Sequence, residues 1–195
     1  PNARVMLNAL LMWDIFQGNP SEGEIEKRFK NPLNGKRKDL TDIPVLLDAH
    51  AYFDVIDIHS LSDYTEIPST VKWLRREMDR RGTQKDIFIG DAFPMSPLLA
   101  YGLETCEEGV LAAKPFYPVT KETRCEAAEL LKALRNPKHA DHSRALEWLQ
   151  QNVATGLVKK YVVAAGEGVQ GINMGNLEDW PLPLGAGTAQ YFGLM

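Results

Sequence analysis

Two side chains able to do acid–base chemistry, Asp57 and His59, lie two positions apart near the end of an apolar run. Residues two apart on a β-strand point to the same face, so both are predicted to line one surface. A carboxylate beside an imidazole can line a ligand pocket or bind a metal ion. The alternative is a buried polar pair that bonds to itself and to backbone groups.

A third chemically competent residue, Asp91, ends a second apolar run at residues 86–90. A carboxylate at the tip of a strand can act as a nucleophile or a base. It can also serve as the N-cap of the segment that follows. A metal site built on Asp57 and His59 would recruit Asp91 as its next ligand.

A polar cluster with one indole ring follows a third apolar run, at residues 169–177. Sugar hydroxyls need polar partners, and the apolar face of a sugar ring stacks on an aromatic side chain. The cluster therefore predicts a carbohydrate subsite, to which Asp63 and Tyr64 of an earlier loop would contribute. The alternative is an ordinary polar loop around one core tryptophan. The residues of the cluster are Asn173, Asn176, Glu178, Asp179 and Trp180.

Strands and a helix must position these groups. Residues 53–59 and 86–90 are apolar runs. Residues 68–81 between them have apolar side chains at helical spacing, at Val71, Leu74 and Met78, and Gly82 closes this helix as a C-cap. A helical crossover between two strands implies a parallel pair with a right-handed connection. In parallel α/β folds, ligands bind at the carboxyl ends of the strands.

The rest of the chain continues the alternation of strand and helix. Ser21 and Glu24 form a capping-box pattern at the start of a short helix. The full pattern predicts an α/β fold with about four parallel strands, a partial (β/α)8 (TIM) barrel in one domain, residues 1–195. The other predicted elements are a strand at 5–10, a loop at 31–38, helices at 41–51, 121–134 and 143–160, and a strand at 169–177. The helix at 143–160 is predicted to have one apolar face, formed by Ala145, Leu146, Leu149, Val153, Leu157 and Val158.

Bulk properties narrow the classes of partner. The net charge is −4 and no basic run has the length typical of nucleic-acid binding, so no nucleic-acid partner is expected. No apolar run reaches the roughly 20 residues of a membrane span, so no membrane partner is expected. No cofactor or metal is expected either. The two cysteines, Cys106 and Cys125, are compatible with one disulfide or with two free thiols.

The strand–helix–strand stretch resembles strands six and seven of glycoside hydrolases with the (β/α)8 barrel. The matching residues are Phe53-Asp-Val-Ile-Asp-Ile-His, a loop with Tyr64, an amphipathic helix, and Lys85-Asp-Ile-Phe-Ile-Gly-Asp. Residues 149–179 look like the seventh helix and eighth strand of that family. The resemblance implies that Asp91 stands at the position of the catalytic nucleophile, where the family has Glu. It also implies that Asp57, His59 and Tyr64 contact the substrate or orient the nucleophile, and that Trp180 stacks on a sugar ring.

The resemblance makes this chain the carboxyl-terminal half of a barrel, strands five to eight. Pro1 and the run from Gln190 look like cuts within a longer protein. The family's acid/base Glu follows its fourth strand, so the parent is expected to bind or cleave a carbohydrate while this chain alone does not hydrolyse it. Unpaired strand edges predict self-association. Two alternatives remain: a non-catalytic carbohydrate-binding or scaffold barrel, and a metal-dependent barrel enzyme that uses Asp57, His59 and Asp91.

Overall fold

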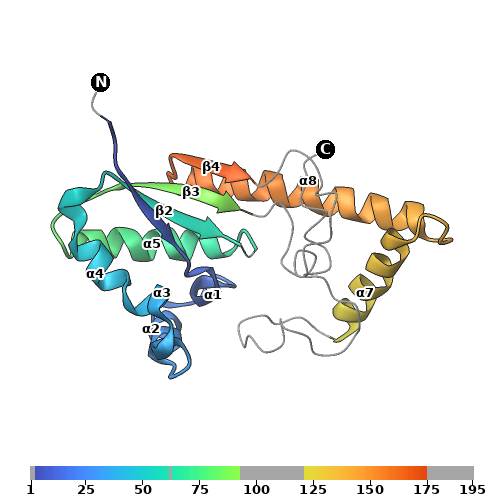
Figure 1. Ribbon diagram of the computed structural model, residues 1–195, viewed down its shortest axis with the longest axis horizontal. Coiled ribbons are helices and arrows are strands. Elements are labelled where there is room, and N and C mark those ends of the chain that lie inside the picture. The colour runs from blue at the N-terminus through green and yellow to red at the C-terminus, as the bar shows by residue number, and fades with distance from the viewer. Residues whose placement is uncertain (1–2, 62, 93–120, 175–195) are drawn as a thin grey trace. The chain divides into compact units, whose positions relative to one another are not determined.

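A four-stranded sheet of order β1-β2-β3-β4 organises the amino-terminal part of the chain (Figure 1). Its strands are β1 (Met6–Leu10), β2 (Val55–Ser60), β3 (Asp86–Ala92) and β4 (Gly171–Met174). The computed structural model describes residues 3–61, 63–92 and 121–174. The chain forms two compact units: the first comprises residues 1–92 and 160–173, and the second comprises residues 93–159 and 174–195.

The strands of the first unit are parallel, as the sequence predicts. β1 pairs with β2 and β2 with β3, both in parallel, and β4 runs in the same direction as β3 (Figure 1). The strand order follows the chain order without a reversal, unlike the order of doubly wound folds. The α/β class and the parallel strands are therefore confirmed. Within the described residues the four strands form an open sheet.

One face of the sheet is apolar and is covered by α5 (Glu66–Asp79), which runs along it in Figure 1. Alternate strand residues are buried on this face because successive side chains point to opposite sides. The apolar positions predicted for the helix, Val71, Leu74 and Met78, are all buried. Gly82 has a φ of +66°, the left-handed conformation that favours glycine just after a helix. The buried strand residues on this face include Ile56, Ile58, Ile87 and Ile89.

Short helices connect β1 to β2. Ser21 caps the second of them, since its hydroxyl oxygen accepts the backbone N–H of Glu24 at 3.4 Å. The loop predicted at 31–38 contains a 3-10 turn and the start of a helix, and the helix predicted at 41–51 is shorter in the structure. The elements are α1 (Trp13–Phe16), α2 (Glu22–Lys30), η1 (Asn34–Lys36), α3 (Lys38–Thr41), α4 (Ile43–Asp48) and η2 (His50–Tyr52).

An ion pair and an aromatic cluster stabilise this connection. The Arg37 guanidinium contacts the buried Asp14 carboxylate of α1 and also Asp39. The ring centroids of Phe29 and Trp73 lie 5.3 Å apart, and Phe16 packs against both. These contacts join α1 and α2 to α5, so the amino-terminal helices belong to the same core as the sheet.

The second unit contains α7 (Lys121–Arg135), which has nearly its predicted bounds, and most of α8 (His142–Gly166), which extends beyond its predicted end at residue 160. His142 Nδ1 lies 3.1 Å from the carbonyl oxygen of Ala133 and ties the two helices together. Cys125 of α7 is disulfide-bonded. None of the helices among the described residues has the length and apolar character required to cross a membrane. A shared apolar cluster is formed by Leu130, Leu131, Leu134, Ala145 and Leu149.

The apolar face predicted for α8 needs a correction. Leu146 and Val158 belong to that predicted face, yet they are 41% and 59% exposed. Lys160, which the pattern of apolar residues leaves out, is 2% exposed. The buried side of α8 therefore excludes Val158 and includes Lys160.

Candidate functional site

Asp57 and His59 lie on the sheet face opposite α5. Both are half-buried, and they alternate along β2 with the buried residues Ile56, Ile58 and Ser60. The prediction that the two polar side chains share one face is therefore confirmed. We call this side of the sheet, with Asp57, His59, Asp91 and Asn173, the polar face.

A β-bulge brings Asp91 to the polar face. Ile58 pairs with Ile89, but the next residue of β2, His59, pairs with Asp91, so Gly90 is an extra residue in β3. By simple alternation Asp91 would point to the same side as Ile89, into the apolar layer. A one-residue shift reverses the side to which a strand residue points. His59 Nδ1 and Asp91 Oδ2 consequently lie 3.9 Å apart.

Gly90 also binds the carboxylate of Asp57. Its backbone N–H donates a hydrogen bond of 2.7 Å to Asp57 Oδ1. A Cβ atom at position 90 would lie 2.4 Å from both carboxylate oxygens, so the absence of a side chain is what admits Asp57 here. On the other side of Gly90, Asn173 of β4 donates from Nδ2 to the Gly90 carbonyl oxygen at 3.1 Å.

The surroundings of Asp57 act on its pKa in both directions, and the net effect is to raise it. Partial burial raises the pKa of Asp57 above its usual value, and the negative charge of Asp91 raises it further. The N–H of Gly90 and the imidazole of His59 act in the opposite direction. Two carboxylates on neighbouring strands thus influence each other across the bulge.

A buried polar cluster lies under the carboxyl end of β2 and was missed at the level of sequence. Lys160 Nζ donates to the carbonyl oxygen of Ser60 at 2.7 Å and to Ser60 Oγ at 3.1 Å. Ser60 Oγ donates to Glu66 Oε1 at 2.6 Å. Burial lowers the pKa of Lys160 to about 8, against the attraction of carboxylates that include Glu66. The available sequence signal was a lysine at helical spacing from Leu157 and Ala164.

The remaining predicted residues are placed only in part. Asn173 lies on the polar face, because Gly171, two positions earlier, faces the ring of Phe88. Tyr64 is half-buried in the loop between β2 and α5, where its carbonyl oxygen accepts the N–H of Ile67 at 3.2 Å. Glu178 and Trp180 lie outside the described residues, as do Asn176 and Asp179.

The polar face does not form a metal-ligand set. Among residues 3–61, 63–92 and 121–174, no three His, Cys, Asp or Glu side chains come close enough together to hold a metal ion. Asp57, His59 and Asp91 therefore do not meet as three ligands in this structure. Their arrangement suits hydrogen bonding to a polar ligand.

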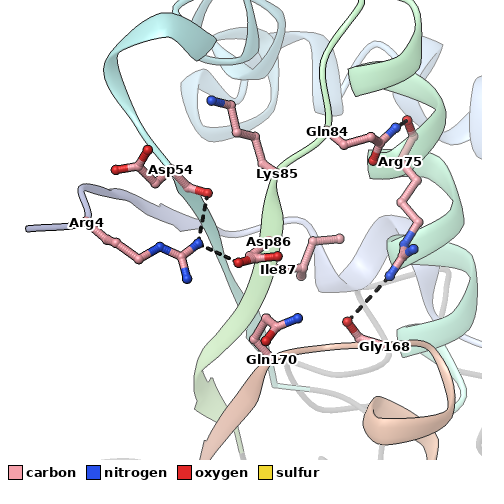
Figure 2. Close-up of a pocket in the computed structure, with 9 residues that line it drawn as sticks. All are labelled: Arg4, Asp54, Arg75, Gln84, Lys85, Asp86, Ile87, Gly168 and Gln170. Atoms are coloured by element: carbon pink, nitrogen blue, oxygen red, sulfur yellow. Dashed lines mark hydrogen bonds and ion pairs between the residues drawn. The ribbon is translucent and has the colours of Figure 1, made fainter. Parts of the chain in front are cut away.

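A hollow of about 540 Å³ lies at the opposite edge of the sheet, where β2 and β3 begin (Figure 2). Two of its charged side chains have partners: Arg4 contacts Asp86 at 2.5 Å, and Arg75 donates to the Gly168 carbonyl oxygen at 3.5 Å. In open parallel α/β sheets ligands bind at the carboxyl ends of the strands, and the hollow lies at the other edge. It is lined by Arg4, Asp54, Arg75, Gln84, Lys85, Asp86, Ile87, Gly168 and Gln170.

Comparison of the chain with protein-family models, with curated proteins and with solved structures finds no match. The class that the described residues define is an α/β protein with a parallel sheet and a polar site at its carboxyl edge. Function must therefore be inferred from the chemistry of this site.

Proposed function

We propose that this chain is part of a (β/α)8 barrel resembling glycoside hydrolases and that it binds carbohydrate at the polar face. The observation that carries the proposal is the bulge at Gly90, which puts Asp91 beside His59 on the face that also bears Asp57. The sequential strand order supports the barrel, because β/α barrels are wound in one direction. In this proposal β1 to β4 correspond to barrel strands five to eight.

The polar face offers the groups that sugar hydroxyls need. The carboxylates of Asp57 and Asp91 accept hydrogen bonds, the amide of Asn173 both donates and accepts, and His59 does either according to its tautomer. All four groups lie at or near the carboxyl ends of neighbouring strands, where barrel enzymes bind substrates. The proposal extends this set to Tyr64, Glu178 and Trp180, with Trp180 stacking on a sugar ring.

Hydrolysis is proposed for the longer protein, with Asp91 as its nucleophile. A retaining glycosidase needs two carboxyl groups about 5 Å apart, one as nucleophile and one as acid/base. The family resemblance assigns the second group to the fourth barrel strand. No strand among the described residues pairs with the outer edges of β1 and β4, and these edges would then be covered by the rest of the barrel or, in the isolated chain, by a second copy.

A non-catalytic carbohydrate-binding barrel is the second candidate, and the identity of residue 91 favours it. Asp is one methylene shorter than the Glu at the corresponding position of the family. A loss of about 1 Å of reach at a nucleophile can cost on the order of 100-fold in rate. In the longer protein, loss of an existing glycosidase activity in Asp91→Ala would identify an enzyme. Activity that arises only in Asp91→Glu would identify a binding protein.

Binding itself is tested on the 195-residue chain by isothermal titration calorimetry against cello-, xylo-, manno-, galacto- and chito-oligosaccharides. We expect at least one series to bind, and His59→Ala to weaken that binding by about tenfold or more, since it removes a hydrogen-bonding group at the centre of the face. His50→Ala, the same change in half-buried η2, is the matched control and should bind as the wild type does. Equal binding by His59→Ala and His50→Ala, or saturable binding of no series, would contradict the proposal.

A further inference from the structure

A lysine side chain is buried directly beneath the polar face. Lys160 lies on the portion of α8 that belongs to the first unit, and it is 2% exposed. Its ammonium group donates to both the carbonyl oxygen and the hydroxyl of Ser60, the last residue of β2. These two bonds fix the final peptide group of the strand together with its side chain.

Three carboxylates attract this ammonium group electrostatically. Glu66 comes from the first turn of α5, Asp63 from the loop after β2, and Asp91 from β3. Glu66 also accepts the hydroxyl proton of Ser60, so it is linked to Lys160 both through the serine and by charge. On α8 itself, the adjacent Lys159 is exposed. The charge of the buried cation is therefore favoured by carboxylates at the carboxyl edge of the sheet.

Ser60 connects this cluster to the site. It directly follows His59 and pairs with Ala92, while His59 pairs with Asp91. These two adjacent pairs are the part of the β2–β3 ladder that lies beyond the bulge. A displacement of Ser60 would therefore move His59 and change its position relative to Asp91.

We infer that Lys160 is a positioning residue: its ammonium group holds the carboxyl end of β2 so that His59 and Asp91 meet on the polar face. The inference deepens the proposed function and rests on it for the nature of the ligand. A neutral side chain of similar shape, such as methionine, fills the same space but makes neither bond to Ser60. It also leaves Glu66 without the buried cation.

The positioning role is tested first without a ligand. In the 195-residue chain labelled with ¹³C-lysine and ¹⁵N, the Lys160 Cε resonance should titrate with a midpoint near pH 8. The backbone amide resonances of His59 and Asp91 should shift with the same midpoint. The Lys160→Met variant should lose this step, and Lys27→Met, the same change at an exposed position of α2, should retain it.

The result that would overturn the inference is a titration of Lys160 that leaves the amides of His59 and Asp91 unmoved. Persistence of their step in Lys160→Met would overturn it as well. If Lys160→Met does not fold, the wild-type titration alone decides, because it compares the same amides above and below the midpoint.

The second arm adds the oligosaccharide that binds in the calorimetric panel. We expect its Kd to rise by about tenfold between about pH 7 and pH 9 in the wild type, because a neutral amine donates weaker hydrogen bonds to Ser60 than the ammonium group does and so holds the carboxyl end of β2 less firmly. A Kd that stays constant across this range contradicts the inference. If no oligosaccharide binds, the proposed function fails, while the ligand-free titration still decides whether Lys160 positions the site.

Discussion

Replacing Gly90 with alanine should disrupt the contact between β3 and Asp57. The new methyl group would lie 2.4 Å from both carboxylate oxygens of Asp57, well inside van der Waals contact. The backbone conformation is not the obstacle, since the glycines with positive φ in the described part of the chain are Gly18, Gly82 and Gly168. The effect of Gly90→Ala should therefore come from displacement of the Asp57 side chain.

The size of the effect follows from the bond that is lost. When the carboxylate of Asp57 swings away, the 2.7 Å hydrogen bond from the Gly90 N–H is broken. Hydrogen bonds to charged groups contribute about 1.5–3 kcal/mol, and the low end applies because Asp57 is half-buried. We therefore expect Gly90→Ala to reduce the free energy of unfolding by about 1.5 kcal/mol.

Urea denaturation followed by circular dichroism measures this loss. Gly23→Ala is the control: position 23 is in α2 and has open space around it, so alanine should stabilise the protein there by about 0.5–1 kcal/mol. The specific test is a double-mutant cycle with Asp57→Ala, which removes the carboxylate. In that background Gly90→Ala should cost less than about 0.5 kcal/mol.

Two results would refute the reasoning. One is a Gly90→Ala variant as stable as the wild type, which would mean that Asp57 does not occupy the space above Gly90. The other is an equal cost with and without the Asp57 carboxylate, which would assign the effect to the backbone of the bulge. If Asp57 binds sugar as proposed, Gly90→Ala should also weaken oligosaccharide binding, because the carboxylate leaves its place on the polar face.

Three further predictions concern stability and assembly. The pKa of Lys160 is lowered from 10.5 to about 8, so the unfolded chain binds this proton more tightly than the folded chain does. In urea denaturation, the stability of the wild type relative to Lys160→Met should therefore rise by about 3 kcal/mol between pH 8 and pH 10.5. A difference that does not change across this window would contradict the burial of a charged lysine. Arg37→Met should cost about 3 kcal/mol because it leaves the buried carboxylate of Asp14 without its cation, whereas Arg80→Met should cost less than about 1 kcal/mol, because Arg80 is exposed and its partner Glu77 keeps Arg81. Equal costs in thermal or urea unfolding would argue against the buried pair. Multi-angle light scattering should find the isolated chain self-associated through the edges of β1 and β4, and a strictly monomeric species at all concentrations would rule this out.

The sequence alone was sufficient for the strands, for the longer helices and for the parallel pairing of β2 and β3. The apolar run before His59, the helical spacing of Val71, Leu74 and Met78, and the glycine at position 82 all report local preferences. Such preferences act within a few residues, so they can be read without knowledge of the fold. The parallel pairing of β2 and β3 followed from the helix between them, because a crossover of that length leaves few other connections. The shared face of Asp57 and His59 followed from the period of a strand.

Tertiary structure decided how the site is assembled. The alternation of β3 places Asp91 with Ile89, and only the register of β3 against β2 reveals the bulge that turns it toward His59. The burial of Lys160 depends on Ser60, which is 100 positions away in the chain. Helical spacing could show that Lys160 lies among buried apolar residues of the helix. It could not identify the distant groups that bind the ammonium group and so allow it to be buried. Local pattern therefore determined which strands carry the polar groups, and long-range packing determined which of those groups meet, because register and the burial of charge depend on contacts between distant segments.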